Sequence, residues 1–354
     1  MLPSVHSDTY SIHFGKTAYR ELKTFLSSAS YPKVFVLVDT NTHRFCLPLF
    51  MAHVEGDYPV EIIEIRAGEQ HKNIETCTQV WETLSQKGAD RKSLLIALGG
   101  GMVTDLGGFV ATTYMRGIDF INIPTSLLAM VDASLGGKTG VDLGVLKNLV
   151  GLISFPRMVV IDSSFLKTLP ANQMKSGAAE MFKHGLICDE AYWNELSNLR
   201  EFTANSLDEA IHRSVKIKNN IVMQDPGESR LRKVLNYGHT LGHAIESCFL
   251  NTERQLLHGE AVAVGIVLAS YISHVLTGFP EEKIQHIKKV FRSHFNKVHF
   301  SAGDYAEIIS LLKHDKKNAY GNINFVLLSD IGKPVLDKAV SRELIVEAFE
   351  YYKK

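Results

Sequence analysis

The sequence has little of what marks several protein classes. Only four of its 354 residues are cysteine, and they form no C-x-x-C pair: Cys46, Cys77, Cys188 and Cys248. Neither a zinc ribbon nor a disulfide framework is therefore expected, and a reducing compartment fits best. Net charge is absent as well, because 38 Lys and Arg balance 38 Asp and Glu. This balance excludes a partner recruited by global charge, such as a nucleic acid.

Targeting and membrane segments are equally scarce. The N-terminus lacks the basic start and apolar stretch of a secretory signal. The longest apolar run, near residues 261–272, is shorter than the about 20 residues that span a bilayer. The sequence thus predicts a soluble, cytoplasmic protein with no membrane partner.

The first part of the chain alternates short β-branched runs with helical patterns. The runs predict strands at residues 34–38, 61–65, 94–98, 121–123 and 159–161. Residues 73–87 are amphipathic at helical spacing and are followed by Gly88, which predicts a helix. This alternation predicts an α/β fold, a Rossmann-like and mostly parallel sheet that has helices on both faces. Ligands of such sheets bind at the carboxyl ends of the strands.

After residue 162 the pattern changes. Helical spacing continues from Ser163 to Thr277, and one later run, at residues 322–328, reads as a strand. Because 354 residues suit two domains, we predict an α/β domain at 1–162 and a mainly α-helical domain at 163–354.

Two glycine-rich turns suggest anion binding. Gly99-Gly100-Gly101 follows a predicted strand and opens a helical pattern with Asp105 in its first turn, so it either binds a pyrophosphate or is only a tight turn. Residues 136–140 carry Lys138, but Asp132 stands where a phosphate loop needs glycine, which excludes a nucleoside triphosphatase. Lys138, followed by Lys147 and Asn148, then suits an anionic, hydroxylated small molecule, unless these are merely solvated loop residues.

The strongest pattern lies in the second domain. Arg232, Asn236, His239 and His243 are spaced four, three and four residues apart, which on one helix would place them on one face. Two histidines four apart can hold one metal ion. Spacing alone selects His239 and His243 as ligands and leaves the third open between two residues, Glu180 and His258. Lys183 shares a helical face with Glu180.

The chain resembles the 3-dehydroquinate synthase family, which belongs to the sugar-phosphate cyclases. The similarity lies in collinear motifs: Gly99–Gly101 with Asp105 and Phe109, Arg116-Gly117, 124–129, 131–140, Lys147-Asn148, 168–170, 179–183, 235–243 and 257–260. It extends from Asp39 to Asp315-Lys316-Lys317 and so covers almost the whole chain. The resemblance implies a homodimeric, cytoplasmic enzyme with NAD and a divalent metal, usually zinc and otherwise cobalt. It also implies a sugar-phosphate substrate, 3-deoxy-D-arabino-heptulosonate 7-phosphate, which is converted to 3-dehydroquinate and phosphate.

The resemblance assigns roles to residues. It implies that NAD is bound by Asp39, Asn41, Gly68, Glu69, Lys72, Gly99, Gly100, Gly101, Met102, Val103, Thr104, Asp105, Thr125, Ser126, Asp132, Lys138, Lys147, Phe165, Thr168 and Leu169. It implies metal binding by Glu180, His239 and His258, and so moves His243 to the substrate. The implied substrate and catalytic residues are Arg116, Asp132, Lys138, Lys147, Asn148, Lys183, Arg232, Asn236, His243 and Lys316.

The implied reaction oxidises a ring hydroxyl with NAD, eliminates phosphate, returns the hydride, opens the ring and closes it by an aldol step. Three positions depart from the family pattern, namely Ala133, Asp142 and Leu146. They keep open a related cyclase that makes an inosose or a valiolone. The sequence is also compatible with a metal-dependent alcohol dehydrogenase of the glycerol dehydrogenase type and with a non-catalytic NAD-binding sensor.

Overall fold

The computed structural model describes residues 2–29, 31–54, 59–144, 146–203, 206–250, 252–312 and 323–354. They divide into two compact units. Unit 1 comprises Met1–Pro170 and Thr203–Met223, and unit 2 comprises Ala171–Phe202 and Gln224–Lys354. The division differs from the predicted one in two respects, because unit 1 continues past residue 162 and takes back one later helix.

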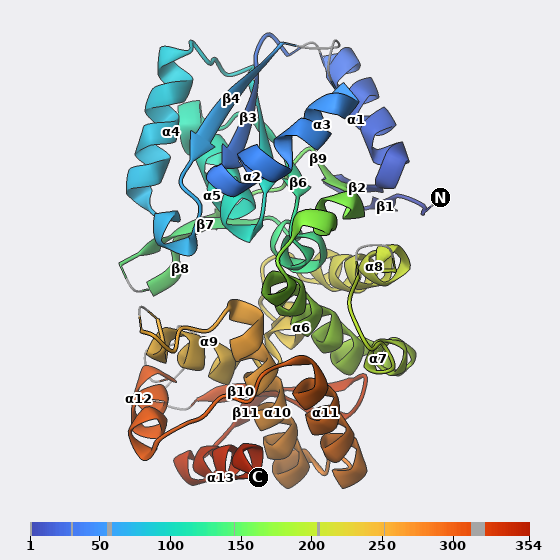
Figure 1. Ribbon diagram of the computed structural model, residues 1–354, viewed down its shortest axis with the longest axis vertical. Coiled ribbons are helices and arrows are strands. Elements are labelled where there is room, and N and C mark those ends of the chain that lie inside the picture. The colour runs from blue at the N-terminus through green and yellow to red at the C-terminus, as the bar shows by residue number, and fades with distance from the viewer. Residues whose placement is uncertain are drawn as a thin grey trace. The chain divides into compact units, whose positions relative to one another are not determined.

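Unit 1 is built on a seven-stranded sheet (Figure 1). Its order is β1 (Val5–His6), β2 (Ser11–Phe14), β9 (Met158–Ile161), β6 (Asp119–Pro124), β5 (Leu94–Gly99), β3 (Val34–Asp39) and β4 (Val60–Ile65). Every neighbouring pair is parallel except β1 and β2. All five predicted strands are confirmed, and the short antiparallel pair β1–β2 was missed.

Helices cover both faces of this sheet, which explains why its strands β3 and β5 are almost entirely apolar. On one face Phe35, Leu37, Leu95 and Ala97 share a core with α4 (Ile74–Gln86) and α5 (Gly101–Thr113). Figure 1 shows α1 (Gly15–Ala29) and α3 (Leu47–Val54) on the other face. Strands buried on both faces carry no polar alternation, so the α/β prediction is confirmed.

Local signals set the ends of α4. The Asn73 side chain accepts the N–H of Thr76 at the first turn, and Gly88 follows the helix with φ +69°. A side-chain oxygen at the N-cap is the expected start signal, and a left-handed glycine after the last turn is the expected stop signal. The helix predicted at 73–87 is therefore confirmed to within a residue at each end.

Two further elements complete unit 1. A hairpin of β7 (Lys138–Leu143) and β8 (Leu146–Ile153) forms a separate two-stranded sheet where the sequence suggested only a glycine-rich loop. Helix α8 (Asp208–Gln224) belongs mostly to unit 1 because its side chains bond there. Lys218 donates to the Asp132 carboxylate (2.7 Å), and a ring nitrogen of His212 lies 3.0 Å from the Pro3 carbonyl oxygen.

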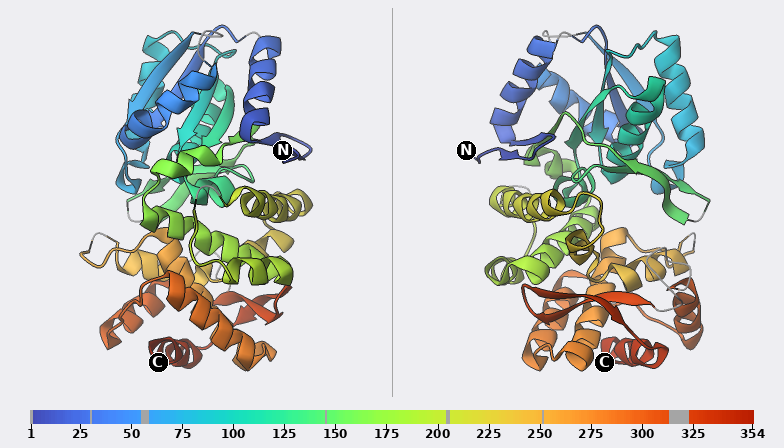
Figure 2. Two further views of the ribbon diagram at one scale, coloured as in Figure 1. Left: turned by 45° about the vertical axis from the view of Figure 1, so that its right-hand side comes forward. Right: turned by 180° about the vertical axis from the view of Figure 1, so that it is seen from behind.

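Unit 2 is mainly helical, as predicted. Its helices are α6 (Ala171–Cys188), α7 (Glu190–Ser197), α9 (His239–Cys248), α10 (His258–Thr277), α11 (Glu281–His294), α12 (Ala302–Leu312) and α13 (Arg342–Lys353). The predicted strand is β10 (Asn324–Asp330), and it pairs with β11 (Lys333–Ala339), which the sequence did not predict. The β10 strand packs against α10 (Figure 2).

Helix α10 corrects one sequence inference. The apolar segment is a 20-residue helix that, by length and composition alone, could cross a membrane. However, 72% of its apolar window is buried inside the protein, where it packs against α6, α9, α11 and α13. Burial on this scale is what the core helix of a helical unit requires.

Candidate functional site

The glycine turn of unit 1 forms the start of a helix, as predicted. Gly100 is the N-cap of α5, and Gly99 ends β5. A side chain on Gly99 would meet Val103, since its Cβ would lie 2.4 Å from the Val103 Cβ. The turn therefore leaves bare backbone N–H groups at the positive end of a helix, where a pyrophosphate binds well.

Many of the other residues implied for NAD lie along the same edge of the sheet. Asp39 ends β3, Thr125 and Ser126 follow β6, and the 3-10 helix η4 (Ser163–Thr168) follows β9. The Thr125 N–H donates to the Gly99 carbonyl oxygen (2.9 Å), which ties two strand ends together. Carboxyl ends of parallel strands are where such sheets bind ligands. The edge also holds Asn41 in α2 (Thr40–Phe45), Gly68 with φ +112°, Met102 to Thr104 in α5, and Phe165 to Leu169.

An ion network around the buried Lys72 lies beside the glycine turn. The Lys72 Nζ is 3.0 Å from an oxygen of Asp105 and 3.2 Å from one of Glu69, and the Lys147 Nζ is 3.7 Å from the same Glu69 oxygen. Burial alone would lower the pKa of Lys72, but these carboxylates raise it. Burial raises the pKa of Asp105 to about 6 against the opposing effect of Lys72. The short ion pair decides the charge of the lysine, which stays cationic.

The predicted anion-binding residues of unit 1 do not all lie together. Lys138, Lys147 and Asn148 lie on the β7–β8 hairpin, and Asp132 is in the π-helical turn η3 (Ala129–Ala133). Arg116, with φ +67°, lies beyond the C-terminal end of α5. Because α5 has 13 residues, Arg116 is about 20 Å from the glycine turn at the other end of that helix.

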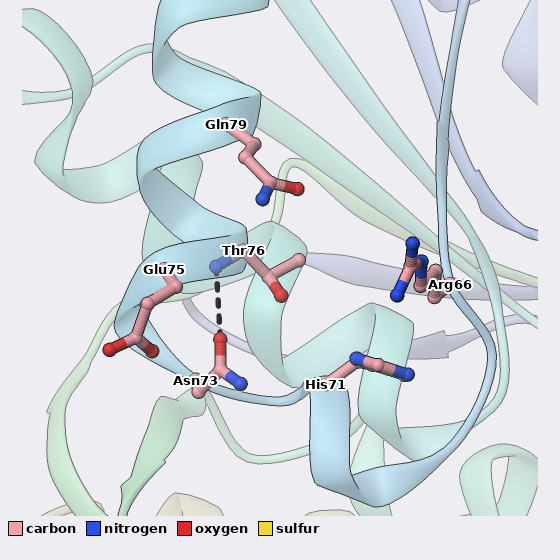
Figure 3. Close-up of a pocket in the computed structure, with 6 residues that line it drawn as sticks. All are labelled: Arg66, His71, Asn73, Glu75, Thr76 and Gln79. Atoms are coloured by element: carbon pink, nitrogen blue, oxygen red, sulfur yellow. Dashed lines mark hydrogen bonds between the residues drawn. The ribbon is translucent and has the colours of Figure 1, made fainter.

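A pocket of about 260 Å³ adjoins the segment Glu69–Lys72, but none of the predicted site residues lines it. Its lining is Arg66, His71, Asn73, Glu75, Thr76 and Gln79, at the end of β4 and the start of α4 (Figure 3). Gly68, Glu69 and Lys72 alternate with these residues along the chain but are not part of the lining.

In unit 2, three helices bring Glu180, His239 and His258 together. The Nε2 atoms of His239 and His258 lie 3.2 and 3.5 Å from the same Glu180 oxygen. Close helix packing makes this possible, since a Cβ on Gly259 would lie 2.1 Å from the Ser176 carbonyl oxygen of α6. On the other side, Gly265 of α10 approaches the Gly238 carbonyl so closely that a Cβ there would lie 2.0 Å away. Helix α10 thus runs back alongside α9, as the sequence suggested.

Both imidazoles are oriented by second partners. The Nδ1 of His239 is 3.1 Å from the Tyr237 carbonyl oxygen, and the Nδ1 of His258 is 3.1 Å from an oxygen of Glu246. Each ring therefore presents its Nε2 toward Glu180, and this is how metal-ligating histidines are usually held. Glu246 was missed by the sequence analysis, although it lies two helical turns after His239 on α9.

The Glu180 carboxylate fits a cation site. It is fully buried, and neither oxygen has a hydrogen-bond partner among the described residues, although both are near positive groups. Its closest neighbour is the buried Lys183 ammonium, one turn further along α6. Burial alone would raise the pKa of Glu180, but the Lys183 ammonium holds it well below its usual range. An ionised, incompletely satisfied carboxylate between two imidazoles is a donor set for a divalent metal.

The imidazoles differ in charge. Burial lowers the pKa of His239, so this ring is neutral, as a metal ligand must be. Burial would also lower the pKa of His258, but Glu180 and Glu246 raise it to about 10. Bound metal would replace that proton.

His243 is also near this cluster. Its ring centroid lies 5.1 Å from that of His239 and 5.7 Å from that of His258, and one nitrogen of each of the three rings lies within 4.8 Å of the others. The geometry therefore allows either of the ligand sets that the sequence and the resemblance suggested.

The single helical face predicted for Arg232, Asn236, His239 and His243 is wrong. The first two lie in the 3-10 helix η5 (Leu231–Asn236), and α9 begins only at His239. Gly238, with φ +78°, breaks the two apart. Arg232 is buried and donates to the Pro226 carbonyl oxygen (2.9 Å), while Asn236 donates to Glu228 (2.9 Å).

The predicted Lys316 lies outside the described residues. The sequence analysis missed Lys218, a buried lysine that donates to the backbone and side chain of Asp132. No local pattern marks it, because its partner is 86 residues away.

Both halves of the chain match known protein families. The family described as 3-dehydroquinate synthase N-terminal matches residues 62–176, and the one described as 3-dehydroquinate synthase C-terminal matches residues 177–318. A 3-dehydroquinate synthase of Parabacteroides distasonis is 44% identical over 336 residues, which cover 94% of this chain and 95% of that protein.

Two solved structures are also similar over nearly their whole length. A 2-deoxy-scyllo-inosose synthase complexed with carbaglucose-6-phosphate, NAD+ and Co2+ has a TM-score of 0.87 at 26% identity, covering 99% of this chain and 100% of that one. The 2-epi-5-epi-valiolone synthase of Streptomyces hygroscopicus with NAD+ and Zn2+ bound has a TM-score of 0.85 at 25% identity, covering 100% and 99%.

Proposed function

Because this chain belongs to the 3-dehydroquinate synthase family, we propose that it converts 3-deoxy-D-arabino-heptulosonate 7-phosphate to 3-dehydroquinate and phosphate. It is a lyase. The relative named for this activity is 44% identical, whereas the inosose and valiolone synthases are 26% and 25% identical. This difference favours 3-dehydroquinate over the products of those cyclases, in spite of Ala133, Asp142 and Leu146.

NAD is the proposed cofactor of unit 1. The support is the bare helix start at Gly99–Gly101 together with the strand-end residues Asp39, Thr125 and Thr168. The carboxylates of Asp39 and Glu69 suit ribose hydroxyls, and the glycine turn suits the pyrophosphate.

A divalent metal, zinc or cobalt, is the proposed cofactor of unit 2, held by Glu180, His239 and His258. The single observation that carries this assignment is the convergence of two imidazole Nε2 atoms on one buried carboxylate oxygen. Three protein ligands leave open positions for substrate oxygens. His243 is then assigned to the substrate.

The bound groups supply the redox and acid chemistry, since NAD accepts and returns a hydride and the metal acidifies the substrate hydroxyl. The chain's own residues bind and orient. Lys138, Lys147 and Asn148 supply donors for an anionic substrate, and Arg232, Asn236 and Lys316 are assigned to it as well. The ammonium of Lys183 keeps Glu180 ionised. Donors fixed in advance stabilise developing negative charge without having to reorganise.

We further propose that the enzyme is a cytoplasmic homodimer. Four exposed large apolar side chains lie on the β7–β8 hairpin, namely Leu143, Leu146, Val150 and Ile153. Grouped apolar side chains of this kind mark interaction surfaces. The distance of Arg116 from the glycine turn supports a role for it at the partner's site. Sedimentation should give twice the 39.4 kDa mass of one chain, and Leu146→Lys should give a monomer. A monomeric wild type would refute the dimer.

One assay tests the main proposal. Phosphate release from the heptulosonate phosphate should need only catalytic NAD and should stop when a chelator removes the metal. Net accumulation of NADH would instead identify an alcohol dehydrogenase. Binding of NAD without any turnover by the metal-loaded protein would identify a sensor.

A further inference from the structure

Asp142 lies where the β7–β8 hairpin of unit 1 meets the segment Glu69–Lys72. Its backbone N–H donates to the Lys72 carbonyl oxygen (2.8 Å), and its Oδ1 accepts the N–H of Asn148 (2.7 Å). It occupies the register shift between Val141 and Leu143 of β7. One residue thus joins the segment Glu69–Lys72 to Lys147 and Asn148.

We propose that Asp142 is a positioning residue that holds Lys147 and Asn148 in the geometry that binds the sugar phosphate. This inference rests on the proposed function, in which the hairpin residues contact the substrate and the segment Glu69–Lys72 contacts NAD. It assigns Asp142 a role that acts through Lys147 and Asn148.

The backbone of Asn148 shows why such a residue is needed. Asn148 has φ +50°, which places a non-glycine residue in the left-handed region inside a strand. Asparagine tolerates this conformation better than most residues, but it persists only where the surroundings enforce it. The short hydrogen bond from its own N–H to the Asp142 carboxylate is that enforcement, since bonds to a charged acceptor are about twice as strong as neutral ones. Without it the Lys147–Asn148 peptide would relax toward an extended strand, and both side chains would turn.

Charge reinforces the arrangement. The Asp142 carboxylate is half-buried and faces two cations, Lys72 and Lys147, and one anion, Glu69. Burial raises its pKa, while Lys72, the Asn148 N–H and Lys147 oppose the rise. Lys147 also lies 3.7 Å from Glu69, so it is held between carboxylates on two elements and its ammonium stays near one position.

The test compares Asp142→Ala, Asp142→Asn and a matched control, Asp90→Ala. Asp90 accepts the N–H of Lys92 (2.8 Å) in the loop before β5, at the opposite edge of the sheet. The control therefore removes the same kind of bond away from the site. Three quantities are measured on the metal-loaded protein: kcat/KM for the heptulosonate phosphate, its Kd for the NAD-free enzyme by calorimetry, and the Kd of NAD.

Asp142→Ala should lower kcat/KM and weaken the substrate Kd by about tenfold or more, the scale of one hydrogen bond to a charged group. The Kd of NAD should change less than the Kd of the substrate, because Glu69 and Lys72 keep their own ion pair, although Lys147 is also implied in NAD binding. Asp142→Asn keeps an oxygen that can accept the Asn148 N–H and should recover most of the loss. Asp90→Ala should match the wild type in all three quantities.

The outcomes separate this inference from the proposed function. A wild type that binds the sugar phosphate without turning it over would refute the proposed function, while the substrate Kd values would still test Asp142. If Asp142→Ala behaves like Asp90→Ala, or if Asp142→Asn loses as much as Asp142→Ala, the positioning bond is refuted. An equal loss of NAD and substrate affinity would also overturn it, because that pattern indicates general damage to unit 1.

Discussion

Glu180→Gln should release the metal from unit 2, whereas His243→Ala should retain it. One oxygen of the Glu180 carboxylate lies 3.2 Å from the Nε2 of His239 and 3.5 Å from that of His258. His243 is close enough to compete for the third position, so the two variants decide between two ligand sets. Glutamine has nearly the same volume as glutamate and leaves packing unchanged.

The magnitude follows from what each group does. Loss of an orienting residue such as Glu246 typically weakens metal binding by about 10–100-fold. Glu246→Gln, which keeps an oxygen for the His258 Nδ1–H, should lie near the lower figure, about 1.4 kcal/mol per tenfold. Loss of a ligand itself should exceed the upper figure.

A stability control is needed because Lys183 is buried beside Glu180. Removing one partner of a buried ion pair costs about 3–5 kcal/mol of unfolding free energy, so Glu180→Gln alone could unfold. The double variant Glu180→Gln/Lys183→Met removes both charges and should fold. It should still lack metal.

The assay is metal content per chain after dialysis against a weak chelator, with circular dichroism as the check on folding. Wild type and His243→Ala should keep about one ion per chain, and the Glu180 variants and His258→Ala should keep almost none. If His243→Ala lost its metal and the folded double variant kept it, the three histidines would be the ligands and the assignment of Glu180 would be refuted.

Three further predictions concern stability. Gly265→Ala should lower the unfolding free energy by about 1–3 kcal/mol, because its Cβ would lie 2.0 Å from the Gly238 carbonyl oxygen. The control Gly303→Ala, with no neighbour closer than 3.6 Å, should not lower it. Equal denaturant midpoints of the two variants would contradict this prediction. The pKa of Asp105 is raised to about 6 in the folded protein from an unfolded value near 3.9. The protonated carboxyl therefore stabilises the fold fully below about pH 4, and this stabilisation is lost as the pH rises through 6. Relative to wild type, Asp105→Asn should therefore gain stability as the pH rises through that window in denaturant titrations, and a constant difference would refute the shift. Lys288 donates to the Tyr351 carbonyl oxygen and Arg292 to that of Tyr352, at the end of α13. Lys288→Met should therefore lower the unfolding free energy by about 0.3–1 kcal/mol, and by more at low salt. An equal loss of unfolding free energy in the variant Lys289→Met, at the exposed neighbouring residue, would count against the capping role.

The sequence predicted best where a short segment determines its own structure. The run 94–98, the three glycines and the helix after them were all predicted correctly, because a strand, a turn and a helix start are fixed within about fifteen residues. The caps of α4 were readable for the same reason. The role of the glycine turn in binding NAD stays a prediction.

The sequence predictions that failed concern features that depend on contacts between distant segments. A continuous helical face from Arg232 to His243 fitted the spacing, but Gly238 adopts φ +78° where it crosses α10, and spacing carries no information on such a crossing. The hairpin β7–β8 was interpreted as a loop because its glycines weaken the strand signal. Lys218 was missed because its partner Asp132 is 86 residues away.

The sequence by itself determined the fold class, the family and the set of chemical groups available, because apolar periodicity and long collinear motifs are properties of the linear chain. The tertiary structure decided which of those groups meet. Glu180, His239 and His258 come from three helices, and their distances depend on glycines at which the helix backbones almost touch. The positioning of Asn148 by Asp142 likewise appears only once the hairpin is folded. Contacts between distant segments follow from packing, and no local pattern encodes them.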